Sequence, residues 1–335
     1  MELPKIGKSE ISADTTCKNS LPKSRKNEIQ ADDIGQMELP KIGKRGKYMT
    51  IKEIFQNKEV TLSFEVFPPK TDDGYEAVEK AAAEIAALKP DFMSVTYGAG
   101  GGTSKNTANI AADLQNKYNT PVLAHLTCVS STREFVKDMI TVYKEKGIEN
   151  IMALRGDIPK EGRICYDYDH ATQLIYDIKS QDDSFCIGGA CYPEGHVECA
   201  RQSEDIEHLK EKVEAGCDFL TTQMFFDNST LYQFLYRIRE KGIDVPVVPG
   251  IMPITNARQV ARSVALSGST IPQKMKIMVD RFADDPQKMK EAGIIYASDQ
   301  IIDLISNGVS HIHVYSMNKP DIAAGIMRNL ATIIR

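Results

Sequence analysis

The segment TLSFEVFPP, residues 61–69, is a short apolar run that carries one carboxylate, Glu65, and ends in two prolines. Its β-branched and aromatic residues, closed by a turn signal, predict a β-strand. An open, doubly wound α/β sheet usually carries Gly-x-Gly-x-x-Gly directly after its first strand. Two prolines stand there instead, so the segment favours a closed barrel over an open sheet.

Seven further apolar runs follow this segment, and helical patterns separate them. Alternation of strands and helices implies a parallel sheet with right-handed crossovers. Eight such units imply an α/β protein with a (β/α)8 TIM barrel over residues 50–335. The expected later strands occupy residues 91–97, 121–129, 150–157, 185–193, 219–226, 245–254 and 311–317.

The stretches between these runs are amphipathic or rich in Ala, Glu and Lys, which predicts helices. About 56 residues separate the seventh and eighth runs, and this gap should hold extra helices. The glycine cluster GAGGGT at 98–103 lacks the dinucleotide-binding spacing, so a loop that lies close to a ligand explains it better. The clearest helical patterns occupy residues 74–88, 132–146, 205–215, 231–241 and 321–334.

The composition is that of a globular protein with a sizeable core, since 42% of the 335 residues are hydrophobic and 26% are charged. A net charge of −5 argues against a general nucleic-acid partner. No apolar run reaches the roughly 18 residues that a membrane span needs. The seven dispersed cysteines lack a Cys-x-x-Cys pair, which indicates reduced thiols, a cytoplasmic protein and no structural metal site.

Residues 1–48 differ from the rest of the chain, because they are rich in Lys, Ser, Asp and Asn and show no sustained period. They predict a disordered extension that precedes a single catalytic domain at 49–335. The octapeptide MELPKIGK occurs twice in this extension, at 1–8 and 37–44. The repeat is either a short docking motif or an accident of where translation begins. The second explanation is favoured, since Met49 would be a natural start.

Polar residues recur at the expected carboxyl ends of six strands, where barrels of this kind form their active sites. Period-two alternation places Ser63 and Glu65 on one face of the first strand. Burial disfavours the charged form of a carboxyl group, so Glu65 is a candidate general acid. The alternative is an inert, salt-bridged glutamate at a strand end.

Other polar residues also have plain structural explanations. His125 could be a core histidine, and Arg155 could simply pair with Asp157. The two imidazoles of His311-x-His313 lie on one strand face, but no nearby residues complete a set of metal ligands. Cys191 and Cys199 are best explained by packing, because no motif marks an activating base for either thiol.

The strand-end motifs together resemble the 5,10-methylenetetrahydrofolate reductase family, in its short, single-domain bacterial type. The resemblance covers residues 50–335 and implies a flavin-bearing barrel. It implies the reduction of 5,10-methylenetetrahydrofolate to 5-methyltetrahydrofolate, which feeds methionine synthesis and one-carbon metabolism. The motifs, in family order, are SFEVFPP (63–69), SVTYGA (94–99), HLTC (125–128), ALRGD (153–157), YPEGH (192–196), TQMFFD (222–227) and PGIMPI (249–254).

The resemblance also implies roles for individual residues. Glu65 matches the general acid that protonates the folate amine N10. Asp157 matches the residue beside the flavin that tunes its potential. Gln223 matches a residue that meets both the nicotinamide donor and the folate, while Gln259 and Lys319 match folate contacts. The positions that match FAD contacts are Thr96, Tyr97, Ala99, His125, Arg155, Gly156, Asp157, Tyr168, Tyr192, His196, Asp205 and Lys212.

The sequence departs from the family at several positions, and His208, Glu211 and Cys199 differ from flavin-contacting counterparts. Ser263 aligns near the aromatic residue that packs on the bound dinucleotide, and Lys319 stands where Arg is more common. The expected electron donor is NAD(P)H in a ping-pong reaction through FAD, with NADH as first choice. The alternative is a partner subunit or ferredoxin. The protein is expected to be a homo-oligomer. Other open interpretations are a flavin-free (β/α)8 lyase or aldolase and a non-catalytic flavin- or folate-binding subunit.

Overall fold

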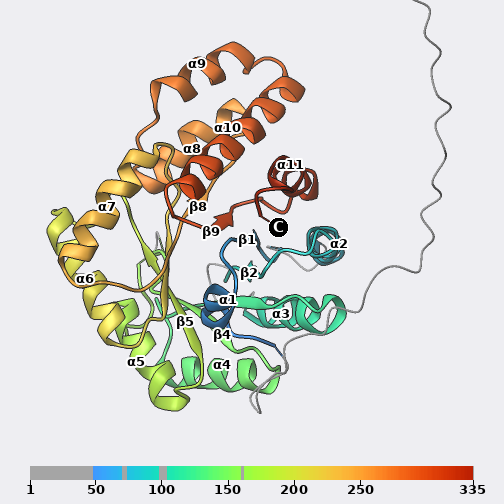
Figure 1. Ribbon diagram of the computed structural model, residues 1–335. Coiled ribbons are helices and arrows are strands. Elements are labelled where there is room, and N and C mark those ends of the chain that lie inside the picture. Colours follow the sequence, from blue (N-terminus) through green and yellow to red (C-terminus); the bar gives the residue numbers. More distant parts are fainter. Residues whose placement is uncertain (1–47, 70–73, 98–103, 160–161, 335) are drawn as a thin grey trace, which may run out of the picture. The chain divides into compact units, whose positions relative to one another are not determined.

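The computed structural model describes residues 48–69, 74–97, 104–159 and 162–334. The predicted extension up to residue 47 and the glycine loop with Ala99 lie outside these described residues. Nine parallel strands form one sheet, which the helices surround (Figure 1). The strands are β1 (Thr61–Val66), β2 (Met93–Val95), β3 (Val122–Thr127), β4 (Asn150–Leu154), β5 (Cys186–Cys191), β6 (Phe219–Thr222), β7 (Val247–Val248), β8 (Gly250–Ile251) and β9 (His311–Val314).

The sheet closes through Pro249, the single residue between β7 and β8. The strand order is β7-β6-β5-β4-β3-β2-β1-β9-β8, so its two ends are the two halves of the seventh expected strand. Proline has no N–H to donate, which interrupts the ladder at this point. Its carbonyl still accepts from the His313 N–H at 2.9 Å. Eight strand positions therefore form the predicted (β/α)8 barrel, with one of them divided.

The helices account for the patterns between the strands and for the long gap before β9. Three helices, α8 to α10, fill that gap as predicted and lie together on one side of the barrel (Figure 1). The helices are α1 (Ile51–Asn57), α2 (Tyr75–Ala86), α3 (Ser104–Tyr118), α4 (Arg133–Glu145), α5 (Ala171–Gln181), α6 (Gln202–Glu214), α7 (Asn228–Glu240), α8 (Ala257–Ser267), α9 (Gln273–Phe282), α10 (Pro286–Ser306) and α11 (Pro320–Leu330).

The two faces of β1 differ in polarity, as the alternation predicted. Leu62, Phe64 and Val66 are at most 1% exposed and belong to the large apolar core. Ser63 and Glu65 lie on the opposite face and contact polar side chains of β2, β3 and β9. Because parallel strands bring their carboxyl ends to one edge, this alternation gathers polar groups in the barrel interior.

Helix α1, which the sequence analysis did not anticipate, covers the amino-terminal end of the barrel. Its residues Ile51, Ile54 and Phe55 pack in a second apolar cluster with side chains from the starts of several strands. The Phe55 ring lies 5.5 Å from the Phe219 ring and 4.2 Å from the His311 imidazole. These contacts fill the barrel from below, opposite the carboxyl ends of the strands.

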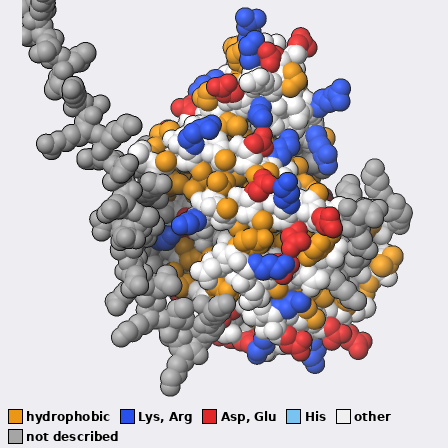
Figure 2. All heavy atoms as spheres, turned by 90° about the vertical axis from the view of Figure 1, so that its right-hand side faces the viewer, with side chains coloured by type: hydrophobic (Ala, Val, Ile, Leu, Met, Phe, Trp, Pro, Cys, Tyr) orange, Lys and Arg blue, Asp and Glu red, His pale blue; other side chains and the backbone are white. Residues whose placement is uncertain are grey.

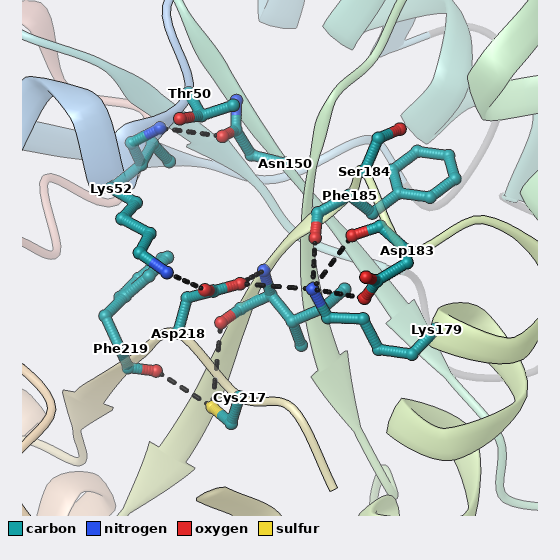
Figure 3. Close-up of polar contacts among 12 residues, drawn as sticks. Thr50, Lys52, Asn150, Lys179, Asp183, Ser184, Phe185, Cys217, Asp218 and Phe219 are labelled. Carbon is teal, nitrogen blue, oxygen red and sulfur yellow. Dashed lines mark hydrogen bonds and ion pairs between the residues drawn. The ribbon is translucent and has the colours of Figure 1, made fainter.

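Polar contacts fix α1 at this end of the barrel (Figure 3). The buried Asn150 side chain accepts from the Ile51 N–H at 2.8 Å and donates to the Val122 carbonyl at 3.0 Å. Lys52 pairs with Asp218 at 2.8 Å, and Asp218 also accepts from the Ile187 N–H. The end of the barrel without the candidate site is thus closed by both packing and hydrogen bonds.

The surface is mixed in charge where Figure 2 displays it. Lys and Arg side chains are interspersed with Asp and Glu on this face, and no broad region of one sign is visible. Mixed charge of this kind gives no electrostatic footprint for nucleic acid on the displayed face. Within the described part of the chain, no helix combines the length and apolarity needed to cross a bilayer.

Candidate active site

A polar cluster inside the barrel surrounds Glu65 at the end of β1. Its Oε2 lies 3.4 Å from the Ser94 hydroxyl, 3.8 Å from Nε2 of His125 and 3.9 Å from Nε2 of His313. The four residues come from β1, β2, β3 and β9. In the parallel register Ser94 lies opposite Glu65, His313 lies opposite Ser63, and His125 lies two residues beyond the partner of Ser94. The Glu65 side chain keeps 18% of its surface exposed, so a ligand at the barrel mouth can reach it.

The histidine beside Glu65 is neutral at physiological pH. Burial lowers the pKa of His125 to about 4, although the Glu65 charge opposes this effect. Tyr315 is also neutral, because burial raises the pKa of its phenol well above the ordinary value, with smaller contributions from Glu65 and Tyr192. Two of the groups around Glu65 are therefore neutral, and no Lys or Arg among the described residues pairs with it.

His313 belongs to this cluster rather than to a metal site. Its Nδ1 lies 2.8 Å from the Ser63 hydroxyl and its Nε2 lies 3.1 Å from the Ser94 hydroxyl. The side chain of His311, on the same strand face, stacks on Phe55 near the bottom of the barrel. In the described ranges, no group of three or more His, Cys, Asp or Glu side chains could hold a metal ion.

A cavity of about 270 Å³ lies at the carboxyl ends of β4 and β5, beside α5 and α6. Seven residues that match FAD contacts line it, which brings together most of that predicted set. Its walls also include His170, Thr172, Glu198 and His208. The seven predicted lining residues are Arg155, Gly156, Asp157, Tyr192, His196, Asp205 and Lys212.

Arg155 bridges two walls of the cavity through Glu198. Its Nη1 and Nη2 atoms donate to the two Glu198 oxygens at 2.7 and 2.9 Å, which is a bidentate contact. This hydrogen bonding raises the pKa of Arg155 and lowers that of Glu198. Asp157 stays exposed at the cavity, and its charge contributes to the raised pKa of Arg155 without a direct ion pair. The alternative Arg155–Asp157 pair does not form.

Helix α6 presents Asp205 and Lys212, two of the residues that match FAD contacts, to the cavity. Lys212 is partly buried, and burial lowers its pKa; its ammonium donates to the Ala190 carbonyl at 3.0 Å. Burial raises the pKa of Asp205, while its hydrogen bond from the His196 N–H opposes that change. A buried ammonium has three donors, so Lys212 retains hydrogen-bonding capacity for an anionic or hydroxyl-bearing ligand.

The remaining predicted cofactor residues lie in other surroundings. Thr96 and Tyr97 follow β2, and the ring of Tyr97 packs against the main core. Tyr168 is 1% exposed, its hydroxyl donates to Asp177 at 2.7 Å, and Arg133 lies over its ring. Tyr168 does not line the cavity, so it supports the β4–α5 connection from below.

The three predicted folate contacts all follow the carboxyl ends of strands. Gln223 comes directly after β6, Lys319 is the N-cap of α11, and Gln259 lies in the first turn of α8. The Gln259 side-chain oxygen accepts from the N–H groups of Thr255 and Asn256, which forms a capping box. Gln259 therefore has a local structural role as well as its predicted position at the mouth.

Several residues of the site were not predicted as functional. Ser94 and His313 complete the cluster around Glu65, and Glu198 pairs with Arg155. Two of these residues were partly indicated by the sequence, because Ser94 opens a strand-end motif and His313 shares a strand face with His311. The contact of His313 with Glu65 depends on barrel closure between β9 and β1, which single-strand patterns do not specify.

The fold and the site define a (β/α)8-barrel enzyme with a polar site at the carboxyl ends of its strands. The family model described as methylenetetrahydrofolate reductase matches residues 50–331. The chain belongs to this family, as its strand-end motifs predicted. Membership places it among oxidoreductases that act on methylenetetrahydrofolate.

Individual relatives agree with this assignment. The 5,10-methylenetetrahydrofolate reductase of Pectobacterium carotovorum subsp. carotovorum is 35% identical over 271 residues, which cover 81% of this chain and 90% of that protein. Methylenetetrahydrofolate reductase (NADH) 1 of Arabidopsis thaliana is 32% identical over 297 residues, and the aligned part is 84% of this chain but 50% of the plant protein.

A solved structure supports the fold. It is described as an uncharacterized protein from Clostridium thermocellum that binds two copies of 5-methyl-5,6,7,8-tetrahydrofolic acid. Its TM-score with this chain is 0.57 at 14% identity, over 84% of this chain and 98% of that one. At this identity the likeness shows the shared barrel architecture.

Proposed function

We propose that this chain reduces 5,10-methylenetetrahydrofolate to 5-methyltetrahydrofolate with a bound FAD, and that Glu65 is the general acid. The observation that carries the proposal is the position of Glu65. Its carboxyl group lies at the barrel mouth within 3.9 Å of Ser94, His125 and His313, without a cationic partner among the described residues. A carboxyl group at this position can donate a proton to a ligand that binds at the mouth.

The cavity beside β4 and β5 fits a flavin nucleotide in its chemistry. Arg155 and Lys212 supply cationic donors suited to phosphate, and Asp205 supplies an acceptor suited to hydroxyl groups. The buried Lys212 ammonium has one carbonyl partner at 3.0 Å and capacity for two more hydrogen bonds. Reduced flavin would supply the hydride that the folate carbon accepts, and these side chains would hold and orient the cofactor.

The proposed chemistry of Glu65 starts from the five-membered ring of the folate. Glu65 transfers its proton to N10, the bond between N10 and the bridging carbon breaks, and both bonding electrons stay on N10. The N5 lone pair then forms a double bond to that carbon, which makes it an iminium able to accept hydride. After hydride transfer the carbon is the N5 methyl group, and Glu65 is left as a carboxylate that must regain a proton.

Other residues around the mouth would position the reactants. Asp157 would lie beside the flavin and tune its potential. Gln223 would contact both the nicotinamide donor and the folate, while Gln259 and Lys319 would contact the folate. Support comes from the placement of all four after the carboxyl ends of strands. Lys319 can offer a point charge to a folate carboxylate, without the bidentate geometry of arginine.

We propose NADH as the electron donor in a ping-pong reaction, with NADPH and a ferredoxin or partner subunit as alternatives. One observation favours a partner subunit or ferredoxin as the electron donor. Ser263 lies buried in α8, near the position that aligns with the aromatic residue that stacks on the dinucleotide in the family. A hydroxymethyl group cannot stack on an adenine as an aromatic ring does. The same activity would supply methyl groups for methionine synthesis, and we expect a cytoplasmic homo-oligomer.

One experiment tests this proposal. The purified full chain is examined for bound FAD, and the flavin is then reduced anaerobically with NADH, NADPH or reduced ferredoxin and reoxidised with methylenetetrahydrofolate. Yellow protein that forms 5-methyltetrahydrofolate supports the proposal. Colourless protein that also fails to take up added FAD contradicts it and would favour a flavin-free lyase, although no described strand contains the lysine that a Schiff base requires. Flavin binding without turnover would indicate a binding subunit.

A further inference from the structure

A buried hydrogen-bonded chain connects β1, β9 and β2 to the carboxyl group of Glu65. The Ser63 hydroxyl lies 2.8 Å from Nδ1 of His313, and Nε2 of His313 lies 3.1 Å from the Ser94 hydroxyl. The Ser94 hydroxyl then lies 3.4 Å from Oε2 of Glu65. Ser63 and Ser94 are fully buried and His313 is 3% exposed, so water does not compete for these contacts.

The Ser63 contacts assign the tautomer of His313. The Ser63 hydroxyl has one hydrogen and donates it to the Ile312 carbonyl at 3.0 Å. Its oxygen therefore accepts from Nδ1–H of His313. A neutral imidazole carries one N–H, so Nε2 has a free lone pair directed at Ser94. This assignment satisfies every contact in the chain.

We propose that Ser94 and His313 are positioning residues that accommodate Glu65 both with and without its catalytic proton. When Glu65 is a carboxylate, the Ser94 hydroxyl donates to it. When Glu65 carries the proton, the Ser94 hydroxyl turns and donates to Nε2 of His313. The proton that reaches the folate leaves Glu65 alone, and neither Ser94 nor His313 loses one. The inference rests on the proposed acid role of Glu65 and deepens it.

The other groups that face Glu65 cannot change their hydrogen bonds with its protonation state. Among the described residues, the titratable side chains around its carboxyl group are His125 from β3, His313 from β9 and Tyr315 directly after β9. His125, with a pKa of about 4, and Tyr315, with its pKa well above the ordinary value, stay neutral across the working range. The Ser94 hydroxyl is therefore the donor whose direction follows the state of Glu65.

The test is the pH dependence of the folate half-reaction, in which prereduced, flavin-loaded protein is mixed with methylenetetrahydrofolate. A rate that depends on proton donation should be higher at low pH and fall with one midpoint as the pH rises. Ser94→Ala removes a donor to the carboxylate, so the midpoint should move up by about one pH unit. In His313→Asn the side chain is still long enough to contact Ser63, but the nitrogen that accepts from the Ser94 hydroxyl is removed. The Ser94 hydroxyl then stays on Glu65, and the midpoint should move down.

Two further variants separate positioning from a general loss of structure. His313→Gln places an amide near the former Nε2 position, so it should restore the midpoint that His313→Asn lowers. Thr61→Val is the matched control, because Thr61 contacts Nδ1 of His311 at 3.2 Å one layer below, on the same pair of strands. It should leave the midpoint unchanged.

A second measurement does not depend on activity. Nitrogen-15 NMR of the full-length protein with labelled histidine should show His313 protonated at Nδ1 and bare at Nε2, with His313→Gln identifying its signals. A His313 ring protonated at Nε2 would overturn the inference. So would pH midpoints of Ser94→Ala and His313→Asn that shift in the same direction or do not shift. A wild-type chain that cannot reduce the folate contradicts the proposed function instead, and the NMR result still decides the tautomer.

Discussion

The Oε2 atom of Glu65 lies 3.8 Å from Nε2 of His125, an imidazole whose pKa burial lowers to about 4. The two side chains come from β1 and β3, on either side of β2. Because the imidazole stays neutral at pH 7, this close pair does not act as an ion pair. The contact with His125 therefore gives Glu65 no cationic partner at this position.

Replacing Glu65 with Gln should separate the two half-reactions. The amide keeps the shape of the side chain but cannot donate a proton to N10, so the folate half-reaction should slow by about 10²–10⁴-fold. Reduction of the flavin by its donor should keep its rate. Stopped-flow absorbance of the flavin measures both steps, and equal rates of folate reduction in the variant and the wild type would exclude the acid role.

The depressed pKa of His125 should make acid weaken the fold. In the unfolded chain the imidazole has a pKa of about 6.5, so unfolding takes up a proton between about pH 6.5 and 4. The stability linked to His125 is therefore complete above pH 6.5 and is lost as pH falls. From pH 7 to 5 the wild type should lose about 2 kcal/mol more unfolding free energy than His125→Gln.

Urea denaturation at the two pH values measures this difference. The control is His208→Gln, since His208 lies in the cavity wall on α6 and its side chain is 50% exposed. That control should lose stability in parallel with the wild type. Parallel loss in His125→Gln as well would show that His125 does not carry the effect.

Lys212→Met should affect ligand binding and stability in different ways. The buried ammonium costs free energy in the folded state, and its lowered pKa reflects that cost, so the flavin-free protein should keep or gain stability. FAD affinity should fall by about 10–100-fold, because a charge-assisted hydrogen bond is lost. Fluorescence titration and urea denaturation measure the two effects.

A matched control lies on the same helix. Lys210 is 43% exposed and pairs with Glu214 at 3.9 Å, so Lys210→Met should change neither FAD affinity nor stability appreciably. Unchanged FAD affinity in Lys212→Met would show that the cavity beside α6 does not hold the cofactor through this residue.

Gly293 allows α10 to pass directly over the end of the seventh strand position. A Cβ atom there would lie 1.9 Å from the Ile254 carbonyl oxygen, so Gly293→Ala should cost about 3 kcal/mol or displace the helix. Gly325→Ala on α11 is the comparison, because its Cβ would meet only the Ile294 side chain, at 3.0 Å. That variant should stay within about 1 kcal/mol of the wild type. Similar unfolding midpoints for both variants would contradict the role of the close approach.

Much of the fold followed from local patterns, because a buried strand has a recognisable composition and period. The alternation around Ser63 and Glu65 predicted their shared face, and the long gap before His311 predicted extra helices. The break at Pro249 and the helix at Ile51–Asn57 were not anticipated. A short amphipathic helix has little signal of its own, and its place is fixed by partners such as Phe219 that lie far along the chain.

The motifs indicated which strand ends carry polar residues, but not the contacts among those residues. Asp205 and Lys212, which lie seven residues apart on α6, both line the cavity. Arg155 pairs with Glu198 instead of its near neighbour Asp157, because the β5–α6 connection returns to the β4 end in space. The ring of Tyr168 is buried against Arg133, a contact that its own segment does not reveal. Such pairs depend on loop conformation, which residue spacing does not determine.

The position of α1 at the bottom of the barrel has a consequence for how the chain folds. Its Phe55 stacks on His311, and the neighbouring Thr61 contacts the same imidazole across 250 residues of sequence. A segment that emerges early from the ribosome must wait for nearly the whole barrel before its apolar face is covered. Closure over so long a loop is slow, which leaves α1 and β1 as the parts of this chain most exposed to chaperones or to misassociation during synthesis.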